Sequence, residues 1–315
     1  MPELDREVHW LEQRLGERHA RRRLGIENDH EARIRWQRVL FGIEAHRLTP
    51  LAIKAVLKAS GMYGRGQRNA ERIEVRRNPV KSASLPQAFE GFSILHLSDL
   101  HCDMSARAMA RLASLLPDLR YDICVLTGDF RGATYGPFEV ALATIAALRA
   151  KIGSPIYGVL GNHDSARMVS RLEAMDIRML MNESETIVRE GQRIHIAGID
   201  DAHFYGTDNI EKAAASTPRD EFSILLSHTP AVYLQAAHAG FDLLLAGHTH
   251  GGQICLPGGI PVTLKSKLPR RFGSGPWRHL AMQGYTSVGA GTGAVPARFN
   301  CAPEITLHYL GGVGE

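Results

Sequence analysis

The 315-residue sequence lacks the features that mark membrane-spanning and exported proteins. It contains no run of 18 apolar residues, which is the minimum from which a spanning helix is predicted. It also shows no signal peptide: after the basic run Arg21–Arg23, the short apolar stretch Leu24–Ile26 leads directly into charged residues. These absences predict a cytoplasmic protein.

Cysteine is scarce as well. The four cysteines, Cys102, Cys124, Cys255 and Cys301, lie far apart in the sequence and form no CxxC pair. Such spacing is typical of reduced thiols in a cytosolic protein and argues against a disulfide framework. None of these thiols has the spacing of a zinc site, so any metal chemistry must use oxygen and nitrogen ligands.

Charge is unevenly distributed along a chain of ordinary globular composition, with 44% hydrophobic and 22% charged residues. Residues 1–90 hold 18 Lys and Arg against 12 Asp and Glu, a net charge of +6, whereas the rest of the chain holds 19 against 21. A basic N-terminal region favours an anionic partner, either nucleic acid or acidic lipid headgroups. The alternative is a helical face that is merely solvated.

The basic region is predicted to be helical. Leu4, Val8, Leu11 and Leu15 recur at helical spacing, as do Trp36, Val39, Leu40 and Ile43, so two amphipathic helices are expected within residues 1–48. Thr49-Pro50 is typical of a helix start and predicts a third helix that ends near Gly61. The stretch 61–68 is rich in Gly and Arg and is interpreted as a hinge. We therefore predict a basic helical region over 1–68 and one further domain over 69–315.

Apolar strands alternate with helix-length segments after about residue 93, which predicts an α/β domain of packed layers. Helices are expected over residues 106–116, 138–150, 166–175 and 230–239. Two β-branched runs, 186–188 and 194–196, flank Glu190-Gly191 and predict a hairpin. The late glycine turn 289–293 is not followed by a helix, so we expect no nucleotide cofactor there.

Polar residues follow five of the apolar runs. In order, these are Asp99-Leu100-His101, Gly128-Asp129, Gly161-Asn162-His163-Asp164, Ser227-His228 and Gly247-His248-Thr249-His250. A lone Asp after a strand is usually a turn or helix cap, but five such groups in order indicate a shared crevice at the carboxyl ends of strands. Carboxylate, amide oxygen and imidazole suit divalent cations, and charge balance favours two of them, bridged by one carboxylate.

The ordered set resembles the five-part signature of the calcineurin-like metallophosphoesterase superfamily, over roughly residues 93–310. The resemblance implies a four-layer α/β/β/α sandwich of two mixed sheets, here with an N-terminal helical extension, and a dinuclear centre of two Mn²⁺, Fe²⁺ or Zn²⁺ ions. It further implies that Asp99, His101 and His250 hold one metal, that Asn162, His228 and His248 hold the other, and that Asp129 bridges them. His163 would contact the phosphate and protonate the leaving oxygen, with Asp164 behind it as an orienting residue.

The expected activity is hydrolysis of a phosphodiester or pyrophosphate bond by in-line attack of a metal-bridging hydroxide, because two cations lower the pKa of bound water toward about 7. The ending Gly247–Ile254 resembles a bacterial phosphodiesterase branch that includes UDP-2,3-diacylglucosamine diphosphatases. The substrate would then be a small or lipid-linked phosphoester, with peripheral contact between the basic N-terminus and anionic lipid at the inner face of the membrane. The alternatives are a nuclease that grips nucleic acid through the same region and, least favoured by the intact ligand set, a non-enzymatic scaffold.

Overall fold

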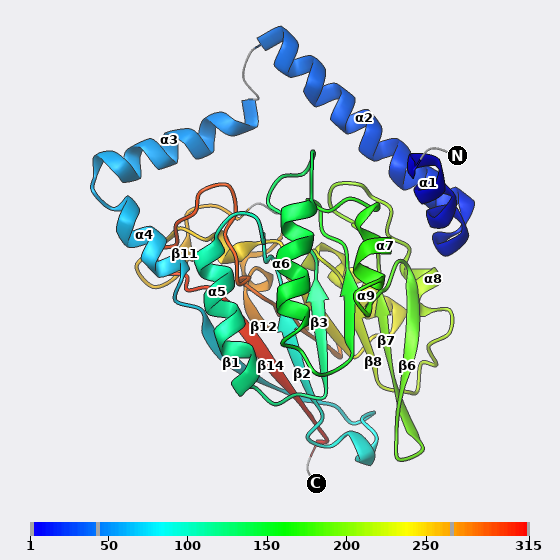
Figure 1. The fold of residues 1–315 in the computed structure, drawn as a ribbon. Coiled ribbons are helices and arrows are strands. Elements are labelled where there is room, and N and C mark those ends of the chain that lie inside the picture. Colours follow the sequence, from blue (N-terminus) through cyan, green and yellow to red (C-terminus); the bar gives the residue numbers. More distant parts are fainter. Residues whose placement is uncertain (1–2, 42–44, 265–267, 314–315) are drawn as a thin grey trace.

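The computed structural model describes residues 3–41, 45–264 and 268–313, with side chains described for 6–34, 50–264 and 268–313. Two six-stranded mixed sheets dominate it (Figure 1). The first has the order β1 (Glu74–Lys81), β14 (Glu304–Gly311), β2 (Ser93–Leu97), β3 (Ile123–Thr127), β4 (Ile156–Val159) and β5 (Ile177–Met179). The second has the order β12 (Gly275–His279), β13 (Met282–Thr286), β9 (Leu243–Ala246), β8 (Ser223–Leu226), β7 (Gln192–Gly198) and β6 (Glu183–Arg189).

Three hydrophobic clusters show how the layers stack. One cluster packs the first sheet against α5 (Ala106–Leu115), α6 (Glu139–Arg149) and α7 (Met168–Glu173). A second lies between the sheets, where Ile94 of β2 and Ile224 of β8 belong to one buried group. The third packs the second sheet against α8 (Ile210–Ala214) and α9 (Tyr233–Ala239). The predicted α/β/β/α sandwich of two mixed sheets is confirmed.

The strands that lead to the polar groups are buried on both faces. Each residue of β2, β3, β8 and β9 is buried, because one face meets helices and the other meets the opposite sheet. This explains why these strands are continuous apolar runs in the sequence. The hairpin predicted around Glu190-Gly191 is confirmed as the antiparallel pair β6–β7, with both turn residues at positive φ.

The N-terminal region is helical but differs in detail from the prediction. It contains α1 (Glu3–Leu15), α2 (Glu17–Phe41), α3 (Ala45–Ala59) and α4 (Tyr63–Ala70). Helix α3 begins before Thr49 and includes Pro50, and the predicted hinge is wrong because α4 occupies most of it. Gly66 explains the difference: a Cβ there would lie 2.7 Å from both Ala297 and Phe299, so this glycine permits close packing of a helix. No helix among the described residues is long and apolar enough to cross a membrane.

Helices α1 and α2 share the core of the sandwich. Leu11, Leu15, Ala20 and Leu24 are buried in the same cluster as β2, β3 and α7. Arg14 of α1 forms ion pairs with Glu173 (2.8 Å) and Glu183 (2.7 Å). Some of the N-terminal arginines therefore bind the body of this chain and do not face solvent.

Arg23 of α2 is the strongest of these anchors. Its guanidinium is fully buried and contacts Glu27 (2.5 Å), Asp200 (3.3 Å) and the carbonyl oxygen of Asp164 (2.9 Å). Glu27 in turn accepts hydrogen bonds from the hydroxyl of Ser165 and the N–H of Ala166, both at 2.7 Å. The loop that carries His163 is thus bonded to α2.

Replacing Arg23 with methionine is expected to lower the free energy of unfolding by about 3–5 kcal/mol, because two buried carboxylates lose their cation. Burial by itself would raise the pKa of Asp200, but Arg23 and His19 hold it below its ordinary value. The Arg23–Asp200 contribution is therefore present above a pH of about 4 and is lost as the pH falls further. Urea unfolding at several pH values measures this, with the exposed Arg18→Met as control, expected within about 0.5 kcal/mol of wild type. Equal small effects of both substitutions would contradict the assignment.

Candidate metal centre

All of the predicted polar groups lie at one edge of the sandwich. Asp99, Asp129 and Asn162 follow the adjacent parallel strands β2, β3 and β4, and His228 and His248 follow the adjacent parallel strands β8 and β9. Parallel neighbours place their carboxyl ends at the same edge, and face-to-face packing brings the edges of both sheets together. The strands thus deliver side chains from five distant segments to one place.

The backbone at this edge is strained. Asp99 (φ 49°), Asp129 (φ 56°) and His248 (φ 71°) are non-glycine residues in the left-handed region, as are His101 and His250. Each such residue costs of order 1 kcal/mol and persists only where its surroundings hold it. Here the N–H of Asp99 donates to the carbonyl of Gly128 (3.1 Å), and the N–H of His101 donates to that of Asp129 (3.0 Å). The loops after β2 and β3 therefore hold each other in these conformations.

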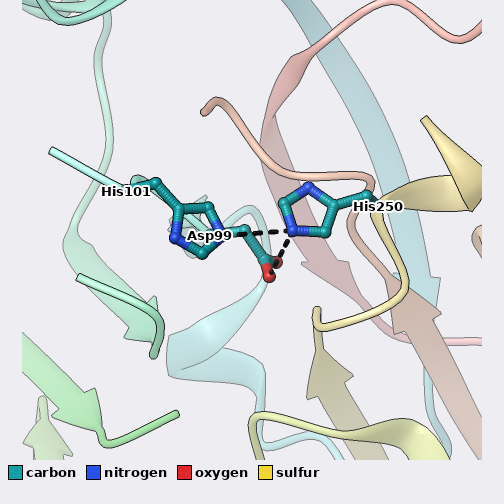
Figure 2. A group of neighbouring side chains, drawn as sticks. All are labelled: Asp99, His101 and His250. Atoms are coloured by element: carbon teal, nitrogen blue, oxygen red, sulfur yellow. Dashed lines mark hydrogen bonds and ion pairs between the residues drawn. The ribbon is translucent and has the colours of Figure 1, made fainter. Parts of the chain in front are cut away.

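Asp99, His101 and His250 form the first ligand group (Figure 2). One ligand atom from each lies within 4.8 Å of the others, and all three residues are buried. The Nε2 atoms of the two imidazoles are 3.1 Å apart, and Nε2 of His250 is 3.5 Å from Oδ1 of Asp99. Figure 2 shows the three side chains close together, with Asp99 and His101 from the loop after β2 and His250 from the loop after β9. These are the residues that the resemblance assigned to one metal.

His228 is the centre of the second group. Its Nε2 lies 3.4 Å from Oδ2 of Asp129, 3.1 Å from Oδ1 of Asn162 and 3.2 Å from Nδ1 of His248. Asp129 lies between the two groups, since the same Oδ2 is 3.7 Å from Nε2 of His101. The structure therefore brings all seven predicted ligands together, with Asp129 placed where a bridging carboxylate would be needed.

Hydrogen bonds behind the imidazoles test whether this donor set fits a metal. Nδ1 of His101 is 2.8 Å from the carbonyl oxygen of Arg131, and Nδ1 of His228 is 2.8 Å from that of Thr127. Because a carbonyl only accepts, each Nδ1 must carry a hydrogen, which leaves Nε2, on the side of Asp129, as the atom that can bind a proton or a metal. This arrangement is typical of histidines that ligate metals, and it fits a dinuclear centre of nitrogen and oxygen ligands.

The electrostatics of the site favour positive charge. Burial alone would lower the pKa of His228, yet Asp129 and Asp99 raise it to about 10. Burial would likewise raise the pKa of Asp129, but His228 and His163 hold it well below its ordinary value. Two buried carboxylates at this edge thus stabilise a cation beside them, whether that cation is a proton or a metal.

His163 lies beside the two groups and is more accessible. Its side chain is 30% exposed, and its Nε2 is 3.9 Å from Oδ2 of Asp129. The ring is held by Thr134, whose hydroxyl is 2.9 Å from Nδ1. Asp164 instead accepts the backbone N–H groups of Phe130 (2.9 Å) and Gly161 (2.8 Å). Asp164 therefore fixes the loops after β3 and β4, while the imidazole of His163 is contacted by the Thr134 hydroxyl and by the ring of His101.

Sequence reasoning missed Thr134 and its support, Arg131. Arg131 is buried and donates to the carbonyl oxygens of His163 (2.6 Å) and Gly136 (2.7 Å), and also to that of Thr134. The available signal in the sequence was an arginine two residues after Asp129. Thr134 gave none, because its contact depends on how Arg131 folds the loop.

The glycine turn 289–293 supports the centre from behind. The N–H of Gly291 donates to the carbonyl oxygen of Asp99 (2.9 Å). A Cβ atom added to Gly289 would lie 2.7 Å from the Cβ atom of Asp99. Arg298, fully buried, donates to the carbonyl oxygens of Gly289 (3.0 Å) and Gly291 (2.7 Å). These glycines allow close backbone approach to a ligand loop, which is a structural use of a motif that resembles a nucleotide site.

Comparison with known proteins agrees with this geometry. Residues 92–252 match the family model described as calcineurin-like phosphoesterase. The chain is 30% identical over 272 residues to the uncharacterized metallophosphoesterase YkoQ of Bacillus subtilis, covering 83% of this chain and 99% of YkoQ. It is 29% identical to YkuE of the same organism, covering 81% of this chain and 91% of YkuE, and 26% identical to phosphodiesterase YaeI of Escherichia coli, covering 70% and 82%.

A family model that spans half of the chain, together with relatives matched along nearly their whole length, identifies the fold and the general chemistry. Candidate ligand groups for divalent cations lie inside the matched segment. The chain belongs to the calcineurin-like metallophosphoesterase family and is a phosphoesterase hydrolase.

Proposed function

We propose that the chain is a dinuclear metal-dependent phosphodiesterase or pyrophosphatase. The observation that carries this proposal is the position of Asp129, whose Oδ2 lies 3.7 Å from His101 and 3.4 Å from His228, between two ligand groups. Asp99, His101 and His250 would hold one ion, and Asn162, His228 and His248 the other. When bound, two divalent ions supply a water of lowered pKa and offset charge on the phosphoryl oxygens.

His163 is proposed as the residue that binds the phosphate and donates a proton to the leaving oxygen. An imidazole titrates near pH 6.5 and can therefore act as a general acid near neutrality. The Thr134 hydroxyl holds Nδ1, so Nε2 points toward the centre. Asp164 is proposed as a positioning residue that keeps the loop after β4 in place through its backbone contacts.

The test is metal stoichiometry with a substrate panel. The purified chain should bind about two Mn²⁺, Fe²⁺ or Zn²⁺ ions, and removal of the metal by a chelator should abolish hydrolysis of phosphodiesters or nucleotide-diphosphate lipids. If activity persists in chelator and elemental analysis finds no metal, the proposal of a dinuclear metal centre is wrong.

We further propose that the substrate is lipid-linked and that the chain docks on an anionic bilayer. The docking face is the apolar rim formed by Leu51 and Val56 of α3, by Met62 directly before α4, and by Leu256, Ile260 and Val262 at the hairpin of β10 (Cys255–Leu256) and β11 (Ile260–Pro261), each 41–66% exposed. Figure 1 shows α3 and β11 at the same side of the molecule. Leu57 of α3 and Ile254, the residue before β10, belong to one hydrophobic cluster with Phe299.

Charge around the apolar rim matches an anionic membrane such as the cytoplasmic leaflet presents. Lys54 and Lys58 lie on α3, and the exposed Arg270 and Arg271 lie on the 3₁₀ turn after the hairpin. Each basic residue near such a surface contributes about 1 kcal/mol. The proposed ligand His250 is five residues before β10, so one short segment connects the hairpin to the metal centre.

Replacing Leu256 and Ile260 with serine should lower the partition coefficient onto phosphatidylglycerol vesicles about 10-fold or more, because two apolar side chains of about 1.5 kcal/mol each no longer insert. Vesicle sedimentation measures this. Hydrolysis of a small soluble diester should be unchanged. The control is Val188→Ser with Leu280→Ser, two equally exposed apolar residues on β6 and beside β13. An equal loss of vesicle binding in both double variants would contradict the docking face. In a separate assay, strong and salt-dependent binding of nucleic acid would favour the nuclease alternative.

A further inference from the structure

A line of buried polar side chains leads from β1 through the first sheet to the ligand Asp99. In order it contains Asn78, His308, His96, Thr127 and Ser98, on β1, β14, β2, β3 and the residue after β2, and none is more than 8% exposed. Asn78 and His308 are register partners, and the line then steps diagonally to His96 and to Thr127. All of these strand residues share the face that looks toward the second sheet.

Every link of the line is a hydrogen bond. Nδ2 of Asn78 lies 3.0 Å from Nδ1 of His308, and Nε2 of His308 lies 3.3 Å from Nδ1 of His96. Nε2 of His96 lies 2.8 Å from the Thr127 hydroxyl, which is 2.7 Å from that of Ser98. The Ser98 hydroxyl is 2.6 Å from Oδ2 of Asp99. Burying such groups is costly unless each is bonded, so an unbroken line of this length is a specific feature of the fold.

Counting hydrogens fixes the direction of each bond. The Ser98 hydroxyl donates to Oδ2 of Asp99. The single hydrogen of Ser98 is then used, so Thr127 must donate to Ser98, and by the same reasoning Nε2–H of His96 must donate to Thr127.

The two histidines continue the same direction. Burial lowers the pKa of His96 to about 3 and that of His308 well below its ordinary value, so both rings are neutral. A neutral imidazole has one donor and one acceptor nitrogen. With Nε2 of His96 as donor, its Nδ1 accepts from Nε2–H of His308, whose own Nδ1 accepts from the Asn78 amide.

We propose that this line is a polarised hydrogen-bond relay that positions Asp99, with every donor directed toward its Oδ2 atom. This inference deepens the proposed function, on which it rests. Oδ2 accepts the Ser98 hydroxyl, and the backbone N–H of His248 is shared between Oδ2 (3.0 Å) and Oδ1 (3.2 Å), while Oδ1 is the oxygen that faces His250 at 3.5 Å. His96, Thr127 and Ser98 are positioning residues: they fix which oxygen of Asp99 is available to the first metal and how the carboxylate is turned.

The glycine at position 247 is consistent with this role. A Cβ at Gly247 would collide with the Ser98 hydroxyl and with Oδ2 of Asp99. The close approach of this backbone to the Ser98–Asp99 hydrogen bond therefore requires glycine at position 247. This glycine begins the segment that carries the candidate ligands His248 and His250.

The tautomers of His96 and His308 provide the first test, on the metal-free, full-length protein. Long-range ¹H–¹⁵N correlation of ¹⁵N-histidine-labelled protein should show both rings neutral and protonated at Nε2, with assignments from His96→Gln and His308→Gln. A hydrogen on Nδ1 of either ring, or a charged ring at neutral pH, would overturn the proposed polarity. This measurement requires neither metal nor activity.

The second test is Mn²⁺ affinity by calorimetry. Thr127→Val retains the shape of the side chain but removes the hydroxyl, and is expected to weaken binding of the first ion about 10- to 100-fold, the range for such supporting residues. The matched control is Thr306→Val. Thr306 pairs with His96 in the sheet, but its buried hydroxyl donates to Tyr285 and is not part of the line. This control should leave Mn²⁺ affinity within about 2-fold of wild type.

The outcomes separate the two proposals. If wild type binds two ions and Thr127→Val binds them equally well, the relay is wrong and the dinuclear function stands. If wild type binds no divalent ion, the proposed function fails, and the tautomers alone decide whether the line is polarised. Should Thr127→Val not fold, Ser98→Ala removes the adjacent link, and unchanged affinity in that variant overturns the proposal.

Discussion

The Asp129→Ala variant is expected to lose about 10³-fold or more in kcat/KM and to retain less than two metal ions per chain. Asp129 is the carboxylate between the two ligand groups, and without it two cations would face each other with no shared negative charge. Several kcal/mol of charge stabilisation disappear, and each 1.4 kcal/mol is about one factor of ten in rate. The substitution also removes Oδ1 of Asp129, which accepts the backbone N–H of His163 at 2.9 Å.

Two further variants separate these effects. Asp129→Asn retains an oxygen acceptor for the backbone N–H of His163 but removes the negative charge. It should therefore lose metal almost as fully as the alanine variant. The exposed Asp118→Ala serves as the control and should match wild type in both metal content and activity. Elemental analysis and steady-state kinetics measure both quantities. Full metal content in Asp129→Asn, with normal turnover, would refute the bridging role.

The His163→Ala variant is expected to retain both metals while kcat falls by about 10²–10⁴, the usual scale for losing a general acid. His163 lies beside Asp129 at 3.9 Å and is held by Thr134, so its removal leaves both ligand groups intact. The loss should depend on the leaving group. A nitrophenolate departs without a proton and should show a small defect, whereas an alkoxide should show nearly the full one.

His248→Ala is the contrasting variant, since it removes a proposed ligand at 3.2 Å from His228 and should slow both substrates alike through loss of metal. Thr134→Val should give a partial defect with the same leaving-group dependence as His163→Ala, because it releases the ring without removing it. Equal defects for both leaving groups in His163→Ala, with metal retained, would indicate that His163 mainly holds the phosphate. Metal loss in that variant would show that the ligand assignment is wrong.

Strands of the sandwich were predictable because of how they are buried. Each strand that ends at the metal edge packs between a helical layer and the opposite sheet, so both faces must be apolar and the run is continuous in the sequence. The polar residue directly after such a run is then conspicuous. For this reason the layer order and all candidate ligands followed from the sequence and its resemblance, although their roles as ligands stay predictions.

The N-terminal helices were harder to place. Helical periodicity predicted that they exist, but it could not show that Arg14 and Arg23 turn inward to carboxylates more than 150 residues away. A basic residue has the same appearance in a sequence whether it meets solvent, a membrane or Glu173. The proposed boundary at residues 68/69 stays a prediction, while α1 and α2 share the core of the body.

The sequence by itself determined the alternation of strands and helices in the α/β domain and the set of polar groups at the strand ends, because these depend on local periodicity and on residue types; the class of reaction followed from the resemblance of that ordered set to a known family. Only the tertiary structure decided which atoms meet: that Thr134 contacts the His163 ring, that Arg23 joins the loops after β4 and β7, and that His96 and His308 lie in one line with Asp99. The physical reason is that hydrogen bonds and ion pairs act over about 3 Å. Such contacts arise between segments that are distant in sequence, and their partners are fixed only when the sheets pack.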